Sequence, residues 1–119
     1  MSKENPKTFR VHRIEQVKSG DDILALVDLG IDSLFKMVRL RLRGVDVPSA
    51  HLAAPSTEAG KVRDMVRQHV LGRECNIQVY SMGKGGWVVT LYVQDADGQI
   101  VNLNSLLIRE GYIYKSERQ

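Results

Sequence analysis

Three arginines alternate with apolar residues in the stretch KMVRLRLRG, at positions Arg39, Arg41 and Arg43. Because successive side chains along a β-strand point to opposite faces, the arginines share one face and the intervening valine and leucines share the other. A row of guanidinium groups can contact the phosphates of a nucleic acid, a mode of binding that does not depend on base sequence. The same row is typical of the solvated outer face of an antiparallel strand. The stretch therefore predicts a strand with a cationic outer face, and both interpretations of that face stay open.

A second group of candidate residues lies in the stretch GKGGWVV. Lys84 sits in its glycine-rich turn, and Trp87 follows within a predicted strand. An aromatic ring beside a cation can stack on the bases of single-stranded nucleic acid. Lys84 and Trp87 therefore join Arg39 and Arg43 as candidate nucleic-acid contacts. Because tryptophan is largely buried on average, a core position is the alternative for Trp87.

The single cysteine, Cys75, excludes a disulfide within one chain and suits a reducing compartment. It opens a predicted strand, where a free thiol most often belongs to the core. The N-terminal stretch MSKENPKTFR lacks the apolar segment of a signal peptide, and no run approaches the roughly 18 apolar residues that span a membrane. We therefore expect a cytoplasmic protein with no membrane partner.

The spacing of apolar residues predicts the elements that position these candidates. The predicted strands span residues 8–17, 23–30, 34–44, 74–82 and 86–94, and the predicted helices span 57–71 and 103–110. Ser56 or Thr57 is expected to cap the first helix and Asn102 the second, because their side-chain oxygens can accept the free N–H groups of a helix start. Gly72 and Gly111 mark the expected helix ends.

The predicted order of elements is β-β-β-α-β-β-α, and the length of 119 residues suits one domain. Five short strands, with a helix between the third and the fourth, predict an all-β protein with helices. Its expected architecture is a five-stranded Greek-key barrel of the OB-fold type. The domain is expected to span residues 8–114, between an N-terminal tail (1–7), which is polar and lacks periodicity, and a C-terminal tail (115–119).

Three stretches together resemble the staphylococcal nuclease (thermonuclease-like) family: SGDDILAL, VRLRLRGVDVPS and DGQIVNLNSLLIREGY. The family pattern has Gly-Asp-Thr at the start of strand two and Arg-Leu-x-Gly-Ile-Asp-x-Pro-Glu at the end of strand three. It closes with a Val-Asn-x-x-Leu helix that ends in Glu-Gly-Tyr or similar. The resemblance covers about residues 10–114, and it implies an OB-fold barrel.

The resemblance also implies calcium-dependent cleavage of DNA and RNA phosphodiesters. In the family, two aspartates and a backbone carbonyl hold the ion, a glutamate activates water and two arginines stabilise the phosphate. By motif, Asp21 and Asp46 match the aspartates, and Val47 would offer the carbonyl. Arg41 matches the first arginine, and Asp22 stands where the family has threonine. These three carboxylates could hold calcium or magnesium, which prefer oxygen ligands; alternatively, Asp21 and Asp22 only favour the turn.

The chain departs from the family pattern at the residues that carry the chemistry. Ser49 follows Pro48 where the catalytic glutamate is expected, and a serine cannot take a proton at neutral pH without a base of its own. Gly86 and Trp87 occupy the place of the second arginine, with Lys84 as the nearest cation. His51, in the same loop as Ser49, could serve as a substitute base or could simply be a surface residue.

We therefore expect a catalytically degenerate nuclease-like domain that binds nucleic acid or a partner protein and needs no cofactor, with weak calcium or magnesium binding at most. The alternative is an active, metal-dependent phosphodiesterase with a rearranged site that uses Asp21, Asp46, Arg41 and His51. A purely structural role for the barrel is a third interpretation, since a fold alone does not define a function.

Overall fold

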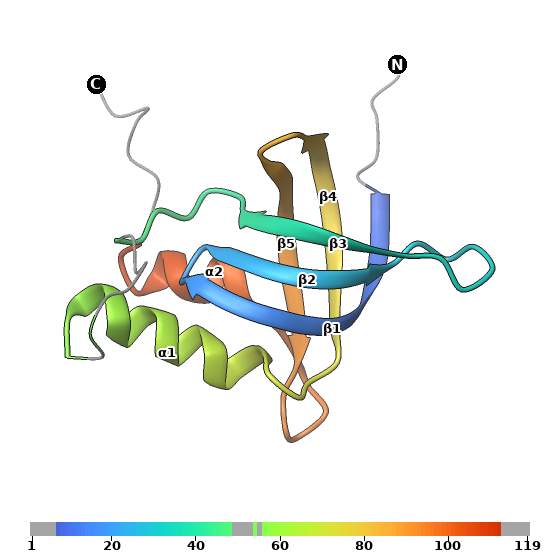
Figure 1. The fold of residues 1–119 in the computed structure, drawn as a ribbon. Coiled ribbons are helices and arrows are strands. Elements are labelled where there is room, and N and C mark those ends of the chain that lie inside the picture. Colours follow the sequence, from blue (N-terminus) through green and yellow to red (C-terminus); the bar gives the residue numbers. More distant parts are fainter. Residues whose placement is uncertain (1–6, 49–53, 55, 113–119) are drawn as a thin grey trace, which may run out of the picture.

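The computed structural model describes residues 7–48, 54 and 56–112. Six strands and two helices lie in this part of the chain (Figure 1). In chain order they are β1 (Lys7–Ser19), β2 (Asp22–Asp28), β3 (Phe35–Leu42), α1 (Glu58–Val70), β4 (Cys75–Gly83), β5 (Gly86–Gln94), β6 (Ile100–Asn102) and α2 (Leu103–Arg109). No helix in these residues is long and apolar enough to cross a membrane.

The strands form one sheet that closes into a barrel. Their order is β3-β2-β1-β4-β5-β6, and a short parallel pairing between β3 and β5 joins the two sides. The long strand β1 serves both halves of the sheet: Lys7–Val11 pairs with β4, and Arg10–Ser19 pairs with β2 through three irregularities in register. Such bulges bend a strand, which lets β1 pass from one side of the barrel to the other. The predicted five-stranded OB-type barrel with two helices is therefore confirmed.

Alternation along the strands fills the barrel with apolar side chains. Inward-facing positions of β2, β3, β4 and β5 are buried, including Ile23, Leu40, Ile77, Val89 and Leu91. Trp87 belongs to this core, with 7% of its surface exposed and its ring centroid 5.7 Å from that of Phe9. Burial raises the pKa of the Cys75 thiol to about 11, as expected for a core cysteine. The core interpretation of both residues is confirmed.

The two helices begin where their caps were expected. The hydroxyl of Thr57 accepts the N–H of Gly60, and the side chain of Asn102 accepts the N–H of Ser105. Helix α1 packs against β1 and helix α2 against β5. Both bury apolar stripes against the barrel, through Val62, Val66 and Val70 in α1 and through Leu103 and Leu107 in α2.

The structure corrects several predicted boundaries. The first strand runs from Lys7 to Ser19, so Lys7 is not part of a tail and the turn that was expected from residue 18 begins only after Ser19. The short strand β6, Ile100–Asn102, was not predicted, because three residues are too few to establish an alternating pattern. The expected C-terminal tail (115–119) and most of the expected N-terminal tail lie outside the described residues.

Candidate functional site

The end of β3 lines an open hollow of about 550 Å³, which we call the groove. Its walls come from the end of β3 with the turn that follows it, and from the start of β5 with the turn that precedes it. The lining residues are Arg41, Leu42, Arg43, Gly44, Val45, Gly85, Gly86 and Val88. The parallel register Arg41↔Val88 brings these two segments together. The groove is therefore a product of the strand pairing that closes the barrel.

Two of the three arginines line the groove. Arg41 and Arg43 are exposed, while the alternating Leu40 and Leu42 are buried, as the sequence predicted. The guanidinium carbon of Arg43 lies 4.1 Å from the centroid of the Tyr80 ring. This is a cation–π distance, and it positions the guanidinium over the face of the ring. The groove thus has one arginine held against an aromatic ring and a second beside it.

Arg39 is held differently from the other two arginines. Its Nε and Nη2 donate to the two carboxylate oxygens of Asp22, at 2.9 and 2.8 Å. This bidentate pair spans neighbouring strands, since β2 and β3 are antiparallel partners. The three arginines therefore share a face, but Arg39 already has a carboxylate partner and does not line the groove.

Asp21 lies in the turn between β1 and β2, close enough to Arg41 for the two charges to interact. Burial raises the pKa of the Asp21 carboxyl above its ordinary value, and the neighbouring Asp22 adds to the rise. The backbone N–H groups of Asp21 itself and of Val47 donate to the carboxylate and oppose the rise, as does Arg41. Asp21 and Arg41 are thus brought together, as the sequence motifs implied.

Gly20 lets the chain pack closely beside Asp21. A Cβ built on Gly20 would lie 2.5 Å from Cγ1 of Val62 in α1 and 3.2 Å from Cγ2 of Val47. Both distances are shorter than normal carbon contacts, so a side chain here would push the helix and the loop apart. The missing side chain therefore keeps the Val47 backbone within reach of the Asp21 carboxylate.

Gly86 is one of the two residues, with Trp87, at the place where the family resemblance expects the second arginine. Its φ is +124°, a conformation that other residues rarely adopt. A Cβ added there would lie 2.7 Å from the backbone oxygen of Arg39. The pairing of β5 with β3 thus requires glycine at this position, and an arginine could not be accommodated without moving one of the strands.

Asn104 was missed by the sequence interpretation, although its side chain hydrogen-bonds the backbone of both strands that line the groove. It is 4% exposed. Its Nδ2 donates to the backbone oxygens of Arg43 (2.9 Å) and Val89 (3.0 Å), and its Oδ1 accepts the N–H of Leu91 (3.0 Å). One amide from α2 therefore ties the end of β3 to β5. The sequence did contain a signal for this role: a second asparagine, two residues after the capping Asn102, lies inside an otherwise apolar helix.

The described contacts give only part of the calcium site that the resemblance implies, so metal binding at Asp21 and Asp46 stays a prediction. Both oxygens of Asp22 bind Arg39, and the Asp46 side chain is exposed on the loop after β3. In the part of the chain that the structure describes, no three carboxylate, histidine or cysteine side chains are grouped to hold a metal ion. The Val47 N–H donates to the Asp21 carboxylate. No metal therefore enters the function proposed below.

The remaining candidate residues either do not line the groove or lie outside the described part of the chain. The buried ring of Trp87 is not available to stack on a base, which corrects its assignment as a nucleic-acid contact. Lys84 is exposed in the turn between β4 and β5 but does not line the groove. Ser49 and His51 lie outside the described residues, so their expected roles stay predictions.

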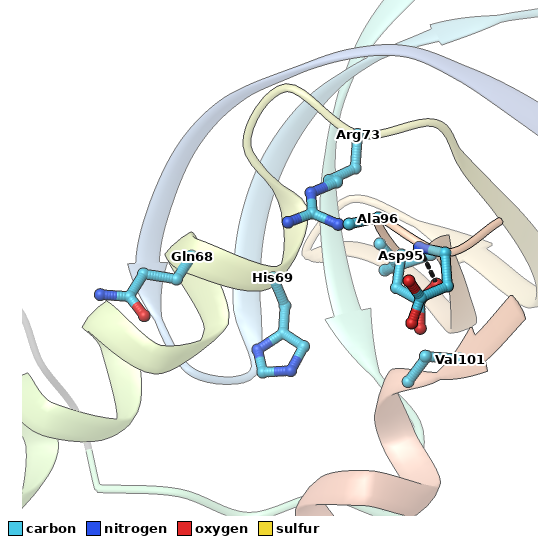
Figure 2. Close-up of a pocket in the computed structure, with 8 residues that line it drawn as sticks. Gln68, His69, Arg73, Asp95, Ala96 and Val101 are labelled. Carbon is cyan, nitrogen blue, oxygen red and sulfur yellow. Dashed lines mark hydrogen bonds between the residues drawn. The ribbon is translucent and has the colours of Figure 1, made fainter. Parts of the chain in front are cut away.

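A second hollow, of about 340 Å³, lies between the end of α1 and the turn that precedes β6 (Figure 2). Its lining mixes His69 and Arg73 with Asp95 and Asp97. The Asp95 carboxylate accepts the N–H groups of Asp97 and Gln99, both at 2.9 Å, so it organises its own turn. The acidic lining makes this hollow less suited than the groove to an anionic ligand.

Comparison with known proteins gives no family for this chain. Models of known protein families do not match it, and neither does any curated protein sequence. The resemblance to the staphylococcal nuclease family therefore stays a prediction from the three sequence stretches.

Proposed function

We propose that this protein binds the phosphodiester backbone of a nucleic acid in the groove and does not cleave it. The observation that carries the proposal is the position of two exposed arginines. Arg41 and Arg43 line one groove, whereas the carboxylate of Asp22 already engages Arg39. Guanidinium groups bind phosphate through charge and through paired N–H donors. Two of them in one groove can each contact a phosphate of the same chain.

The walls of the groove favour a close approach by such a ligand. Gly44, Gly85 and Gly86 contribute no side chains to it. Glycine allows a ligand to come near the backbone, where N–H groups can act as further donors to an anion. The contact of Arg43 with Tyr80 limits the rotation of that guanidinium, which lowers the entropy lost when it binds.

Binding without cleavage is supported by the residues that line the groove. None of the described lining residues carries a carboxylate or an imidazole that could activate water. Gly86 and Trp87 stand where the family has its second arginine. The backbone leaves no space for a side chain at Gly86, and Trp87 is buried. The resemblance to a nuclease family supports a nucleic acid as the ligand, and these departures support loss of the reaction.

The salt dependence of binding tests this proposal. Fluorescence anisotropy of a labelled single-stranded oligonucleotide should give a slope of log affinity against log salt of about −1.4, because each of two phosphate contacts contributes about −0.7 on single strands. The double variant Arg41→Gln/Arg43→Gln should lose most of this slope. Arg39→Gln is the matched control. It should change the slope by much less than the roughly 0.7 that one phosphate contact contributes, since Asp22 already binds that arginine.

Two results would overturn the proposal. Equal affinity and equal slope for the wild type and the Arg41/Arg43 double variant would show that the groove is not the binding site. Plasmid nicking in calcium, magnesium or manganese that is abolished by Asp46→Ala would show that the protein is the metal-dependent phosphodiesterase of the alternative interpretation.

A further inference from the structure

Strand β3 has an open edge along its first half. Its pairing with β2 covers the whole strand, from Phe35 to Arg41 and beyond, but its pairing with β5 covers only Leu40–Leu42. The hairpin of β4 and β5 ends at the Gly83↔Gly86 pair, beside the point where the β3 pairing begins. Among the described residues, no strand therefore pairs with the side of Phe35 and Met37 that faces away from β2.

The hydrogen bonds at the two ends of β3 show which main-chain groups point to this open edge. Leu29 N–H donates to the oxygen of Leu34, and Leu42 N–H donates to the oxygen of Asp21. Because bonded positions alternate along an antiparallel strand, the even-numbered residues of β3 bond to β2. The odd-numbered residues point the other way, as the bond from Arg43 N–H to the oxygen of Val89 in β5 shows. The N–H and C=O groups of Phe35 and Met37 therefore face the open edge.

Apolar side chains surround this edge. The turn between β2 and β3 projects beyond the barrel (Figure 1). On the turn and the start of β3, four large apolar residues are exposed by 42% or more: Ile31, Leu34, Phe35 and Met37. The Phe35 ring also lies 4.8 Å, centroid to centroid, from the ring of His12 on β1. A contiguous set of exposed apolar side chains is typical of a surface that binds another protein.

The charge of β3 indicates what kind of segment fits the edge. The charged residues of β3 are Lys36, Arg39 and Arg41, and Arg43 follows the strand directly. None of these residues is acidic. A second copy of this chain, paired edge to edge, would bring one cationic strand beside another, and like charges on neighbouring strands are unfavourable. An acidic strand would instead be attracted, most directly by Lys36, which borders the edge.

We propose that the open edge of β3 at Phe35–Met37 binds an extended segment of a partner protein that adds to the sheet as a strand. Main-chain hydrogen bonds to Phe35 and Met37 supply the attachment, as in other cases of strand addition. The segment alternates apolar and acidic residues. Its apolar side chains contact Phe35 and Met37, and its acidic ones, on the opposite face, approach Lys36. This site is separate from the groove and does not depend on the function proposed for it.

A synthetic peptide of alternating valine and glutamate, labelled with fluorescein, tests the proposal. We expect saturable binding, and on binding the amides of Phe35 and Met37 should become protected from hydrogen exchange, while those of Lys36 and Val38 are protected with or without peptide. N-methylation of the peptide at alternate residues should abolish binding when it blocks the pairing edge and leave it when it blocks the other edge. A peptide with lysine in place of glutamate should bind at least about tenfold more weakly, because of its charge.

A substitution in the protein gives an independent test. Met37→Pro removes a donor that faces the open edge together with the Met37 side chain, and proline is tolerated at such positions of edge strands, so peptide binding should be lost while the barrel stays folded. Met37→Ala keeps the donor and should weaken binding less. Two peptides, each N-methylated along a different edge, should differ in binding. If both still bound, strand addition would be overturned by a result that uses no variant of the protein. A dimer of the wild type that Met37→Pro abolishes, with no peptide binding, would replace the proposed partner by a second copy.

Discussion

The two halves of β3 differ in their exposed side chains and in their pairing partners. In the second half, Leu40–Leu42 pairs on both sides, and the exposed Arg41, with Arg43 just beyond, lines the groove. In the first half the strand pairs on one side only, and the exposed residues Phe35 and Met37 are apolar. The pairing partner therefore decides what the strand can bind: side chains act in the closed half, and main-chain groups remain available in the open half.

Arg39 lies at the boundary between these two regions. Its backbone oxygen faces Gly86 at the start of β5, and its side chain is bound by Asp22 on β2. A strand that changes from paired to unpaired at one residue can carry two independent surfaces, since a ligand in one does not need to displace the other. The predictions below test whether the two regions respond separately.

The largest effect is expected from Asn104→Ala, which should lower the free energy of unfolding by about 2–4 kcal/mol, because it leaves the buried Leu91 N–H and Arg43 C=O without a partner. Urea unfolding measures the loss. Hydrogen exchange should accelerate at Arg43 and Leu91 before it does at Lys36, because the amide fastens only the closed half.

Asn102→Ala is the matched control for this substitution, two residues earlier. It removes a helix cap and should cost only about 1 kcal/mol. If the two variants unfolded at the same urea concentration, the three hydrogen bonds of Asn104 would have no special part in closing the barrel.

Gly86→Arg places an arginine at one of the two positions that match the family's second arginine. It should lower the free energy of unfolding by about 1–3 kcal/mol, because of the positive φ and the close Arg39 oxygen. It should not confer nuclease activity. Gly85→Arg is the control: a Cβ at Gly85 meets no atom within 4 Å, so this neighbour should tolerate the same change with little loss. Thermal unfolding compares the two, and a Gly86→Arg protein as stable as Gly85→Arg would contradict the tight approach of β5 to β3.

The smallest effect concerns Asp21, whose pKa is raised in the folded protein mainly by burial. A carboxyl with a raised folded pKa holds its proton more tightly when folded, so its contribution to stability falls as the pH rises from the unfolded pKa, near 3.9, through the folded value. Asp21→Asn should therefore match the wild type at about pH 3 and be the more stable protein at about pH 7. Asp32→Asn, in the exposed turn at the open end, controls for the loss of one negative charge. If the stability gained by Asp21→Asn over the wild type shrank as the pH rose, the pKa of Asp21 would be lowered in the folded protein and not raised.

The sequence by itself determined the elements and their exposed faces. Alternation in KMVRLRLRG established which side of β3 would carry the arginines, and the capping side chains of Thr57 and Asn102 placed the two helix starts. These features depend on residues within a few positions of one another, so local periodicity and local hydrogen bonding are enough to predict them. The order of strands around one intervening helix was likewise enough to predict an OB-type barrel.

Only the tertiary structure decided what each arginine does. Asp22 and Arg39 are 17 residues apart, and Asn104 and Arg43 are 61 apart. Such pairs meet because the register of the closed barrel places them opposite one another, and that register follows from packing the whole core at once. The same closure requires Gly86, buries Trp87 and leaves Phe35 and Met37 unpaired on one side. A one-residue change in register would exchange the faces of a strand, so no local pattern could assign these partners before the barrel was closed.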